Sequence, residues 1–216
     1  MPRLGVDEAG KGPVLGGMVA AAVLADPDAL PDGVTDSKRL SPERRRALDT
    51  TLQSHADVAV GVAHIPVAAI DDPDTDMNSL TVEAHAAAVR AVPADLDDVA
   101  GTLDAADPDA DRFARRVTDR LGSTPTLEGR HGADATDAVV GAASIVAKVA
   151  RDAHVASLAT DYDADLGSGY PGDPVTRSFL ADYVDTHGSL PPCARRSWQT
   201  SRDVLAAHDQ AVLTEF

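Results

Sequence analysis

The segment LGVDEAGKGP, residues 4–13, sets the first structural expectation for this chain. Its apolar start ends on two acids, Asp7 and Glu8, and a glycine-rich turn then leads into the apolar residues 14–24. A strand, a turn and a second strand are predicted, because the apolar runs flank glycines that tolerate the backbone conformations of turns. The chain is therefore expected to start with a β-hairpin that carries two carboxylates near its turn.

Alternating strands and helices are predicted for the rest of the chain. Three further apolar runs, residues 58–65, 99–104 and 124–127, are predicted to be strands. Helices are predicted from apolar spacing and from start signals such as Ser41-Pro42-Glu43. They cover residues 42–55, 66–70, 78–92, 107–121, 137–159, 173–188 and a segment from residue 201. This order indicates an α/β fold with five strands.

Length and composition limit the class of protein. A chain of 216 residues can form one domain, or one domain with a small appendage. Its single cysteine, Cys193, excludes an internal disulfide and a cysteine-rich zinc module, and suits a reducing compartment. The longest apolar stretch, residues 18–25, is too short to span a membrane, and no signal peptide precedes the first strand. We therefore expect a soluble, cytoplasmic protein with no membrane partner.

The net charge of -16 comes from 35 acidic and 19 basic side chains. Such a charge alone argues against a polyanionic partner, because Coulomb repulsion slows association. The acids are spread over nearly every loop, however, and the chain has only 3 Lys. This composition resembles that of proteins from the salt-loaded cytoplasm of halophiles, where screening shortens the range of charge interactions. The local charge around a site must therefore decide the ligand.

Four acids occupy positions that are typical of active sites in α/β proteins. Asp7, Glu8 and Asp104 end apolar strands, and Asp134 precedes the most apolar helix. Ligands of open α/β sheets bind at the carboxyl ends of strands and at helix starts. For any one of these acids, the alternative interpretation is a solvated turn or helix cap. Adjacent strand residues point to opposite faces, so Asp7 and Glu8 share one site only if the strand ends or bends between them.

Six segments, in this order along the chain, resemble type 2 ribonuclease H (ribonuclease HII) of the archaeal type. They are GVDEAGKGP (5–13), DSKRLS (36–41), LDA (103–105), HGADA (131–135), AASIVAK (142–148) and GSGYPGDP (167–174). The resemblance spans residues 4 to about 200. It implies a ribonuclease H-like fold, with a five-stranded mixed sheet flanked by helices. Residues 1–190 would be the catalytic domain, and residues 191–216 a small helical appendage and tail.

The resemblance also implies a metal-dependent endoribonuclease. It assigns catalysis and the binding of two divalent ions, Mg²⁺ or Mn²⁺, to four residues: Asp7, Glu8, Asp104 and Asp134. Converging carboxylates repel one another, and hard divalent cations, which prefer oxygen ligands, neutralise their negative charge. The implied substrates are RNA/DNA hybrids and duplex DNA with a single ribonucleotide, cut on its 5′ side to leave 3′-hydroxyl and 5′-phosphate ends. The histidines show no zinc-binding spacing.

Carboxylates and metal ions do not distinguish RNA from DNA, so another group must read the 2′-hydroxyl. The resemblance assigns this role to the glycine loop, Gly10-Lys11-Gly12, and to Tyr170, and it assigns a substrate phosphate to Lys38. The alternatives from the residues alone are an ordinary surface turn for Tyr170 and a solvated side chain for Lys38.

The chain departs from the family pattern at two places. Lys11 stands where arginine is usual, and lysine lacks the guanidinium group that can bind a phosphate through two parallel hydrogen bonds. Gly132 stands where lysine is usual, and residues 136–138 replace the usual Lys-Tyr-Pro, which weakens phosphate binding on this side. This replacement puts Asp137 near the predicted site, and we rank Asp107 and Asp137 below Asp104 and Asp134 as catalytic candidates.

The last seven residues resemble the sliding-clamp (PCNA) binding peptide of related archaeal enzymes. Gln210, Leu213 and Phe216 follow its spacing, although the usual second aromatic residue is missing. A frayed helix end with a buried Phe216 is the alternative.

Two rival functions stay open at this point. One is a ribonuclease H-like nuclease that cuts DNA, such as a junction resolvase, for which a ribose reader would have no use. The other is a non-catalytic, clamp-tethered binding module, against which the four carboxylates argue. The expected enzyme acts as a monomer.

Overall fold

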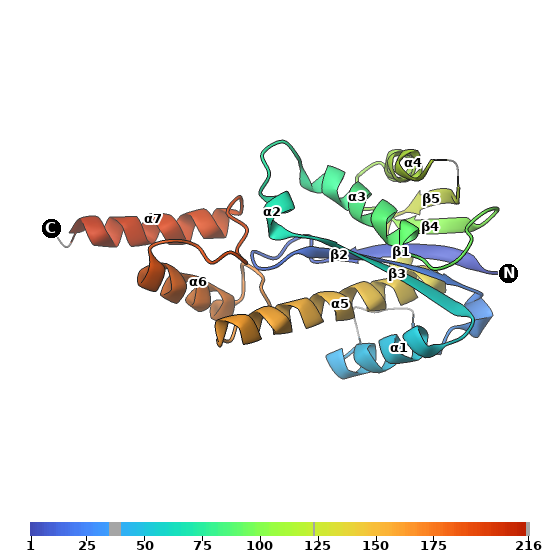
Figure 1. Ribbon diagram of the computed structural model, residues 1–216, viewed down its shortest axis with the longest axis horizontal. Coiled ribbons are helices and arrows are strands. Elements are labelled where there is room, and N and C mark those ends of the chain that lie inside the picture. The colour runs from blue at the N-terminus through green and yellow to red at the C-terminus, as the bar shows by residue number, and fades with distance from the viewer. Residues whose placement is uncertain (35–39, 123, 215–216) are drawn as a thin grey trace. The chain divides into compact units, whose positions relative to one another are not determined.

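The computed structural model describes residues 1–34, 40–122 and 124–214. Five strands form one sheet in the order β3-β2-β1-β4-β5 (Figure 1). Their bounds are β1 Arg3–Ala9, β2 Met18–Ala25, β3 Val58–Ile65, β4 Ala100–Asp104 and β5 Thr126–Arg130. Strand β2 runs antiparallel to β1, whereas β4 is parallel to β1 and β5 is parallel to β4. The predicted five-stranded mixed sheet is confirmed.

The α-helices of the described residues follow the predicted order. Their bounds are α1 Pro42–Ser54, α2 Val67–Ile70, α3 Met77–Arg90, α4 Ala110–Leu121, α5 Ala138–Tyr162, α6 Pro174–His187 and α7 Gln199–Thr214. Helix α1 begins as its start signal predicts, because the Ser41 side chain accepts a hydrogen bond from the Arg44 amide at 3.2 Å. Within the described ranges, each helix is too short or too polar to cross a lipid bilayer.

The chain divides into two compact units. The first, here called the sheet unit, comprises Met1–Ala9, Val19–His64 and Met77–Arg151. The second, here called the helical unit, comprises Gly10–Met18, Ile65–Asp76 and Asp152–Phe216. The expected boundary after residue 190 stays a prediction, and residues 191–216 belong with residues 152–190 in the helical unit.

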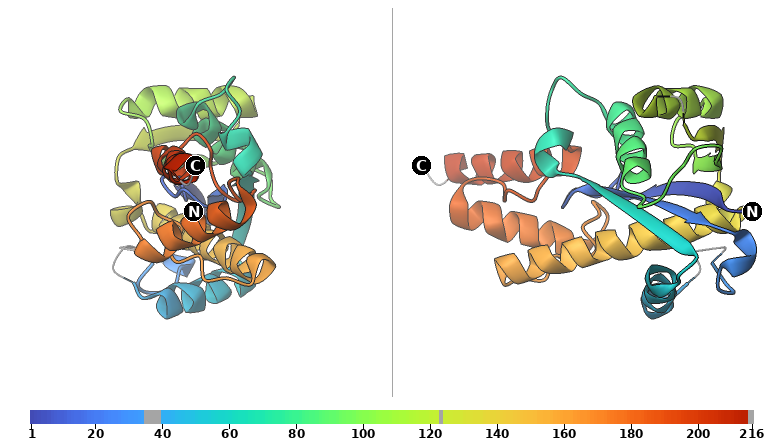
Figure 2. Two further views of the ribbon diagram at one scale, coloured as in Figure 1. Left: turned by 90° about the vertical axis from the view of Figure 1, so that its left-hand side faces the viewer. Right: turned by 45° about the vertical axis from the view of Figure 1, so that its right-hand side comes forward.

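Helices cover both faces of the sheet in the sheet unit. Helices α3 and α4 lie on one face, and α1 lies on the other (Figures 1 and 2). On that second face, Val23 of β2 belongs to one buried cluster with Leu48 of α1 and Ile145 of α5. Gly5 of β1 permits this packing, because a Cβ there would lie 2.4 Å from the Val139 carbonyl carbon of α5. Strand β1 is therefore held directly against the start of α5.

The helical unit has a core of its own. Its buried cluster includes Leu15, Leu166 and Leu180. An antiparallel bridge joins Leu15 to Ala194, and the Val14 amide donates to the Gly169 carbonyl at 2.8 Å. These contacts tie the residues that follow the glycine loop to two segments more than 150 positions later in the chain.

Candidate active site

The structure brings together three of the four predicted catalytic acids. Asp7 lies on β1, Asp104 ends β4, and Asp134 lies in a short 3-10 turn, Ala133–Ala135. One carboxylate oxygen from each lies within 4.8 Å of the others. Strands β1 and β4 are parallel neighbours, so their carboxyl ends meet at one edge of the sheet. The topology of the sheet therefore assembles this cluster.

Backbone contacts hold the turn that carries Asp134. The Ala133 amide donates a hydrogen bond to Asp104 Oδ1 at 3.2 Å. Gly132 has φ +64°, a left-handed conformation that glycine adopts at little cost. The departure from lysine at position 132 therefore occurs where the backbone favours glycine.

The Asp7 carboxyl is destabilised in its ionised form. It is only 4% exposed, and burial followed by the charge of Glu8 raises its pKa from 3.8 to about 7. A hydrogen bond from Ser144 and the ammonium of Lys148 oppose that rise. Lys148 also contacts the Ser144 hydroxyl, so α5 presents a donor and a positive charge to Asp7. Lys148 therefore lies beside the carboxylate cluster.

The ionised form of the Asp104 carboxyl is also destabilised. Burial first, and then the charges of Asp134 and Glu8, raise its pKa, while the Ala133 amide opposes the rise. A divalent cation would stabilise the ionised carboxylates, because it pairs with several of them at once. Carboxylate oxygens are the ligands that Mg²⁺ and Mn²⁺ prefer. The donor set therefore fits a hard divalent ion.

Glu8, the fourth predicted acid, approaches the cluster differently. Strand β1 pairs with β2 without interruption through Ala9, so it does not end between Asp7 and Glu8. The two side chains therefore point to opposite faces. Glu8 Oε2 lies 2.8 Å from Nε2 of His85 on α3. The Glu8 carboxylate is outside the 4.8 Å group, but its charge still raises the pKa of Asp7 and Asp104.

Sequence reasoning missed His85. The side chain is fully buried on α3. A histidine among the alanines and valines of residues 82–89 was the available signal in the sequence.

The predicted ribose-reading residues lie together in the helical unit. Gly10 has φ +89°, which favours glycine. A Cβ on Gly12 would lie 3.7 Å from Cε1 of Tyr170, so the Tyr170 ring sits against the glycine loop. The Tyr170 side chain is 45% exposed. An exposed aromatic ring is thus placed beside backbone that a ligand can approach closely.

A buried arginine holds the glycine loop. Arg195 has no exposed surface, and its guanidinium donates to four backbone carbonyls: those of Gly10 at 2.6 Å, Lys11 at 2.9 Å, Gly16 at 2.9 Å and Gly17 at 3.2 Å. The guanidinium carbon lies 4.7 Å from the Trp198 ring, and Trp198 Nε1 donates to the Gly12 carbonyl at 3.1 Å. Arg195 and Trp198 therefore fix the path of the loop.

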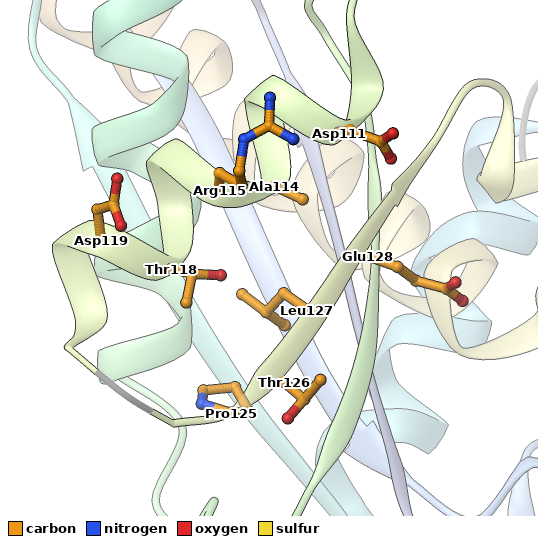
Figure 3. A pocket seen from close by; sticks show the side chains of 9 residues that line it. All are labelled: Asp111, Ala114, Arg115, Thr118, Asp119, Pro125, Thr126, Leu127 and Glu128. Carbon is orange, nitrogen blue, oxygen red and sulfur yellow. The ribbon is translucent and has the colours of Figure 1, made fainter.

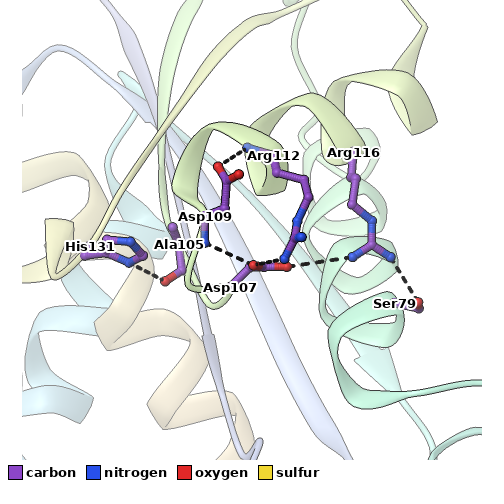
Figure 4. A network of polar contacts seen from close by, with 7 residues as sticks. All are labelled: Ser79, Ala105, Asp107, Asp109, Arg112, Arg116 and His131. Atoms are coloured by element: carbon purple, nitrogen blue, oxygen red, sulfur yellow. Dashed lines mark hydrogen bonds and ion pairs between the residues drawn. The ribbon is translucent and has the colours of Figure 1, made fainter.

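Two nearby acids have structural roles. Figure 4 shows the guanidinium groups of Arg112 and Arg116 converging on Asp107. The Asp109 amide, together with Arg112, lowers the pKa of Asp107. Asp137 accepts a hydrogen bond from the Val139 amide at 2.9 Å at the start of α5. Neither acid belongs to the 4.8 Å cluster.

Comparisons with known proteins show the family to which this chain belongs. The family model described as Ribonuclease HII matches residues 4–201. Ribonuclease HII of Haloarcula marismortui is 61% identical over 214 residues, which cover 99% of this chain and 100% of that protein. The chain belongs to the ribonuclease HII family. It is therefore a ribonuclease, and members of this family are metal-dependent endoribonucleases that act on RNA/DNA hybrids.

Solved structures of the family share the fold. The ribonuclease H2 of Pyrococcus horikoshii matches with a TM-score of 0.87 and 35% identity, over 97% of this chain and 100% of that one. The ribonuclease HII of Archaeoglobus fulgidus, solved in complex with PCNA, matches with a TM-score of 0.82 and 31% identity. That match covers 94% of this chain and 96% of the Archaeoglobus chain. The ribonuclease H-like fold is thus confirmed.

Two predicted substrate and clamp residues of this ribonuclease HII, Lys38 and Phe216, lie outside the described residues. Gln210 is exposed on α7, and Leu213 belongs to the same helix. The roles predicted for these residues stay predictions.

A separate cavity in the sheet unit lies between α4 and β5 (Figure 3). It has a volume of about 400 Å³, and residues such as Arg115, Leu127 and Glu128 line it. None of the predicted site residues lines this cavity.

The pKa of Asp7 predicts how the metal-free ribonuclease responds to pH. In the unfolded chain Asp7 loses its proton near 3.8, whereas in the folded protein it keeps the proton up to about 7. The folded state then binds more protons, so the Asp7 contribution to stability falls as pH rises from about 4 to 7 and is constant above that. We expect the melting temperature of wild type, relative to Asp7→Asn, to fall across this window in a chelating buffer. A constant difference would contradict the raised pKa.

Proposed function

We propose that this ribonuclease HII cleaves duplex DNA on the 5′ side of a single embedded ribonucleotide, in addition to the RNA strand of hybrids. One observation carries the proposal: the carboxylate oxygens of Asp7, Asp104 and Asp134 gather within 4.8 Å at the carboxyl ends of adjacent strands. Such a cluster suits hydrolysis of a phosphodiester assisted by divalent ions.

Two divalent ions, Mg²⁺ or Mn²⁺, are proposed to bind the three aspartates together with Glu8. Although Glu8 leaves β1 on the other face, its charge raises the pKa of both Asp7 and Asp104, which supports a place for its carboxylate beside the same ions. When bound, they supply an activated water for attack on phosphorus and stabilise the departing 3′-oxygen, so that the products carry 3′-hydroxyl and 5′-phosphate ends. Neighbouring residues orient two of these metal-binding carboxylates or favour their ionised form. The Ala133 amide orients Asp104, and Ser144 with Lys148 favours the ionised form of Asp7.

The glycine loop, Gly10-Lys11-Gly12, and Tyr170 are proposed to read the ribose. The exposed Tyr170 ring beside Gly12 offers a flat surface for the sugar, and its hydroxyl can hydrogen-bond at the 2′ position. Arg195 supports this role, because it fixes the carbonyls of the loop and leaves its outer side to the ligand. Lys38 is proposed to contact a substrate phosphate, as the family resemblance implies.

The test uses two duplexes of the same sequence, one with a single ribonucleotide and one entirely of DNA. In molar salt with Mg²⁺ or Mn²⁺, we expect one nick on the 5′ side of the ribonucleotide and no nick in the all-DNA duplex. Product ends are assigned by ligation and by phosphatase treatment. High salt is required because the charge of -16 must be screened before a polyanion can approach.

The rival functions give other outcomes in that assay. Cleavage of the all-DNA duplex would indicate a DNA-cutting nuclease and would remove the need for a ribose reader. Binding to the duplex without cleavage in either metal would indicate a non-catalytic module. Both results overturn the proposal.

The C-terminal tail is proposed to bind the sliding clamp of the source organism, with the enzyme itself acting as a monomer. The Archaeoglobus enzyme of similar structure was solved with PCNA, and the spacing of Gln210, Leu213 and Phe216 follows the clamp-binding pattern. Deleting residues 210–216 is expected to abolish clamp binding measured by calorimetry and to leave the kcat for a short ribonucleotide duplex unchanged. Clamp affinity that survives the deletion would move the binding site elsewhere.

A further inference from the structure

The contact between His85 and Glu8 has a specific geometry. The His85 ring is fully buried on α3, with Nε2 at 2.8 Å from Glu8 Oε2. The ring packs edge-on against Phe113, with centroids 5.0 Å apart and an angle of 87° between the planes. Among the described residues, Nδ1 is buried without a hydrogen-bond partner. The histidine is therefore fixed by packing on one side and by Glu8 on the other.

This geometry defines which atom donates. A neutral imidazole carries one N–H and one acceptor nitrogen. An N–H on Nδ1 would be buried without an acceptor, and Nε2 and the Glu8 carboxylate would then be two acceptors at 2.8 Å. The proton therefore sits on Nε2, which donates to Glu8 Oε2 and leaves Oε1 for another ligand.

We propose that His85 is a positioning residue, which holds the Glu8 carboxylate so that one oxygen remains directed to a divalent ion. This inference rests on the proposed role of Glu8 as a metal ligand. Glu8 needs such support more than the aspartates do. Its side chain is longer, and it leaves β1 on the face opposite to Asp7.

Metal-ligating carboxylates commonly depend on such partners. Removing the hydrogen-bond partner of a ligand typically lowers metal affinity or activity by roughly 10- to 100-fold. The alternative is that His85 only fills the core beside Phe113. If His85 positions Glu8, the N–H donor is required. If His85 only fills the core, the volume of its ring is sufficient.

Three variants of the full chain separate the alternatives. His85→Phe keeps the ring and removes the donor, whereas His85→Gln keeps an amide donor at similar reach. Val89→Ala, on the same helix and 1% exposed, creates a cavity without changing His85 and controls for lost stability. The measurements are Mn²⁺ binding by calorimetry without substrate, and kcat and KM on a ribonucleotide duplex.

For His85→Phe we expect Mn²⁺ affinity and kcat to fall by roughly 10-fold or more, with KM unchanged. His85→Gln should recover most of both, and Val89→Ala should melt at a lower temperature with wild-type kcat and Mn²⁺ affinity. Wild-type kcat and Mn²⁺ binding in His85→Phe, or equal losses in His85→Phe and His85→Gln, would overturn the inference. If wild type itself cleaves no ribonucleotide duplex, the proposed function fails instead, and the Mn²⁺ titrations still test His85.

Discussion

Asp7→Asn is expected to abolish cleavage of RNA/DNA hybrids and, at pH 8 without metal, to raise the melting temperature. The variant loses one of three carboxylate oxygens that lie within 4.8 Å of one another. Because bound ions supply several kcal/mol of transition-state stabilisation, we expect at least about a 10³-fold loss of kcat. The gain in stability follows from the pKa of about 7, which shows that the folded protein opposes ionisation of this carboxyl.

Opposite effects on activity and stability distinguish a metal ligand from a structural residue. A structural aspartate would lower both when it is replaced. The matched control is Asp137→Asn, because Asp137 caps α5 three positions after Asp134 and asparagine caps a helix equally well. It should keep wild-type activity and a similar melting temperature. Hybrid cleavage by Asp7→Asn at the wild-type rate would remove Asp7 from the site.

The positions of Asp7 and Asp104 were predictable from the sequence because each ends an apolar run that forms a strand. Apolar runs ending in acids marked β1 and β4, and parallel neighbours bring their carboxyl ends together. The glycine-rich turn also gave a correct signal, because Gly10 adopts a positive φ. The close contact of Gly5 with α5 was visible only in the structure.

Contacts between distant side chains were not predictable in this way. His85 and Glu8 are 77 positions apart, and a helix pattern shows which face is buried but not which partner that face meets. The same limit applies to Lys148, whose charge acts on Asp7 from α5. The division into two units also escaped prediction, because each unit gathers three separate segments without linkers.

The contacts of Arg195 with distant backbone were also not predictable from the sequence, and their removal is expected to have a large effect on stability. Arg195→Met is expected to lower the free energy of unfolding by about 3–5 kcal/mol, because it removes the buried donor of four hydrogen bonds to backbone carbonyls. Native proteins are stable by only about 5–15 kcal/mol, so the loss is a large share of the total. Arg195→Lys should recover part of it, since an ammonium cannot reproduce the planar fork.

The matched control is Arg196→Met. The Arg196 side chain is exposed, and the contact of Arg196 with Asp71 is made by its backbone amide, which the substitution keeps. Both variants are measured by denaturant unfolding in molar KCl, followed by binding to the single-ribonucleotide duplex and to the all-DNA duplex under conditions where each variant is folded. Because the loop carbonyls lose their anchor, folded Arg195→Met should bind the ribonucleotide duplex less selectively over all-DNA duplex. Arg196→Met should match wild type in both measurements. If Arg195→Met were as stable and as selective as wild type, the loop would be held by its glycines and by Trp198 alone, and the buried guanidinium would have no role in reading ribose.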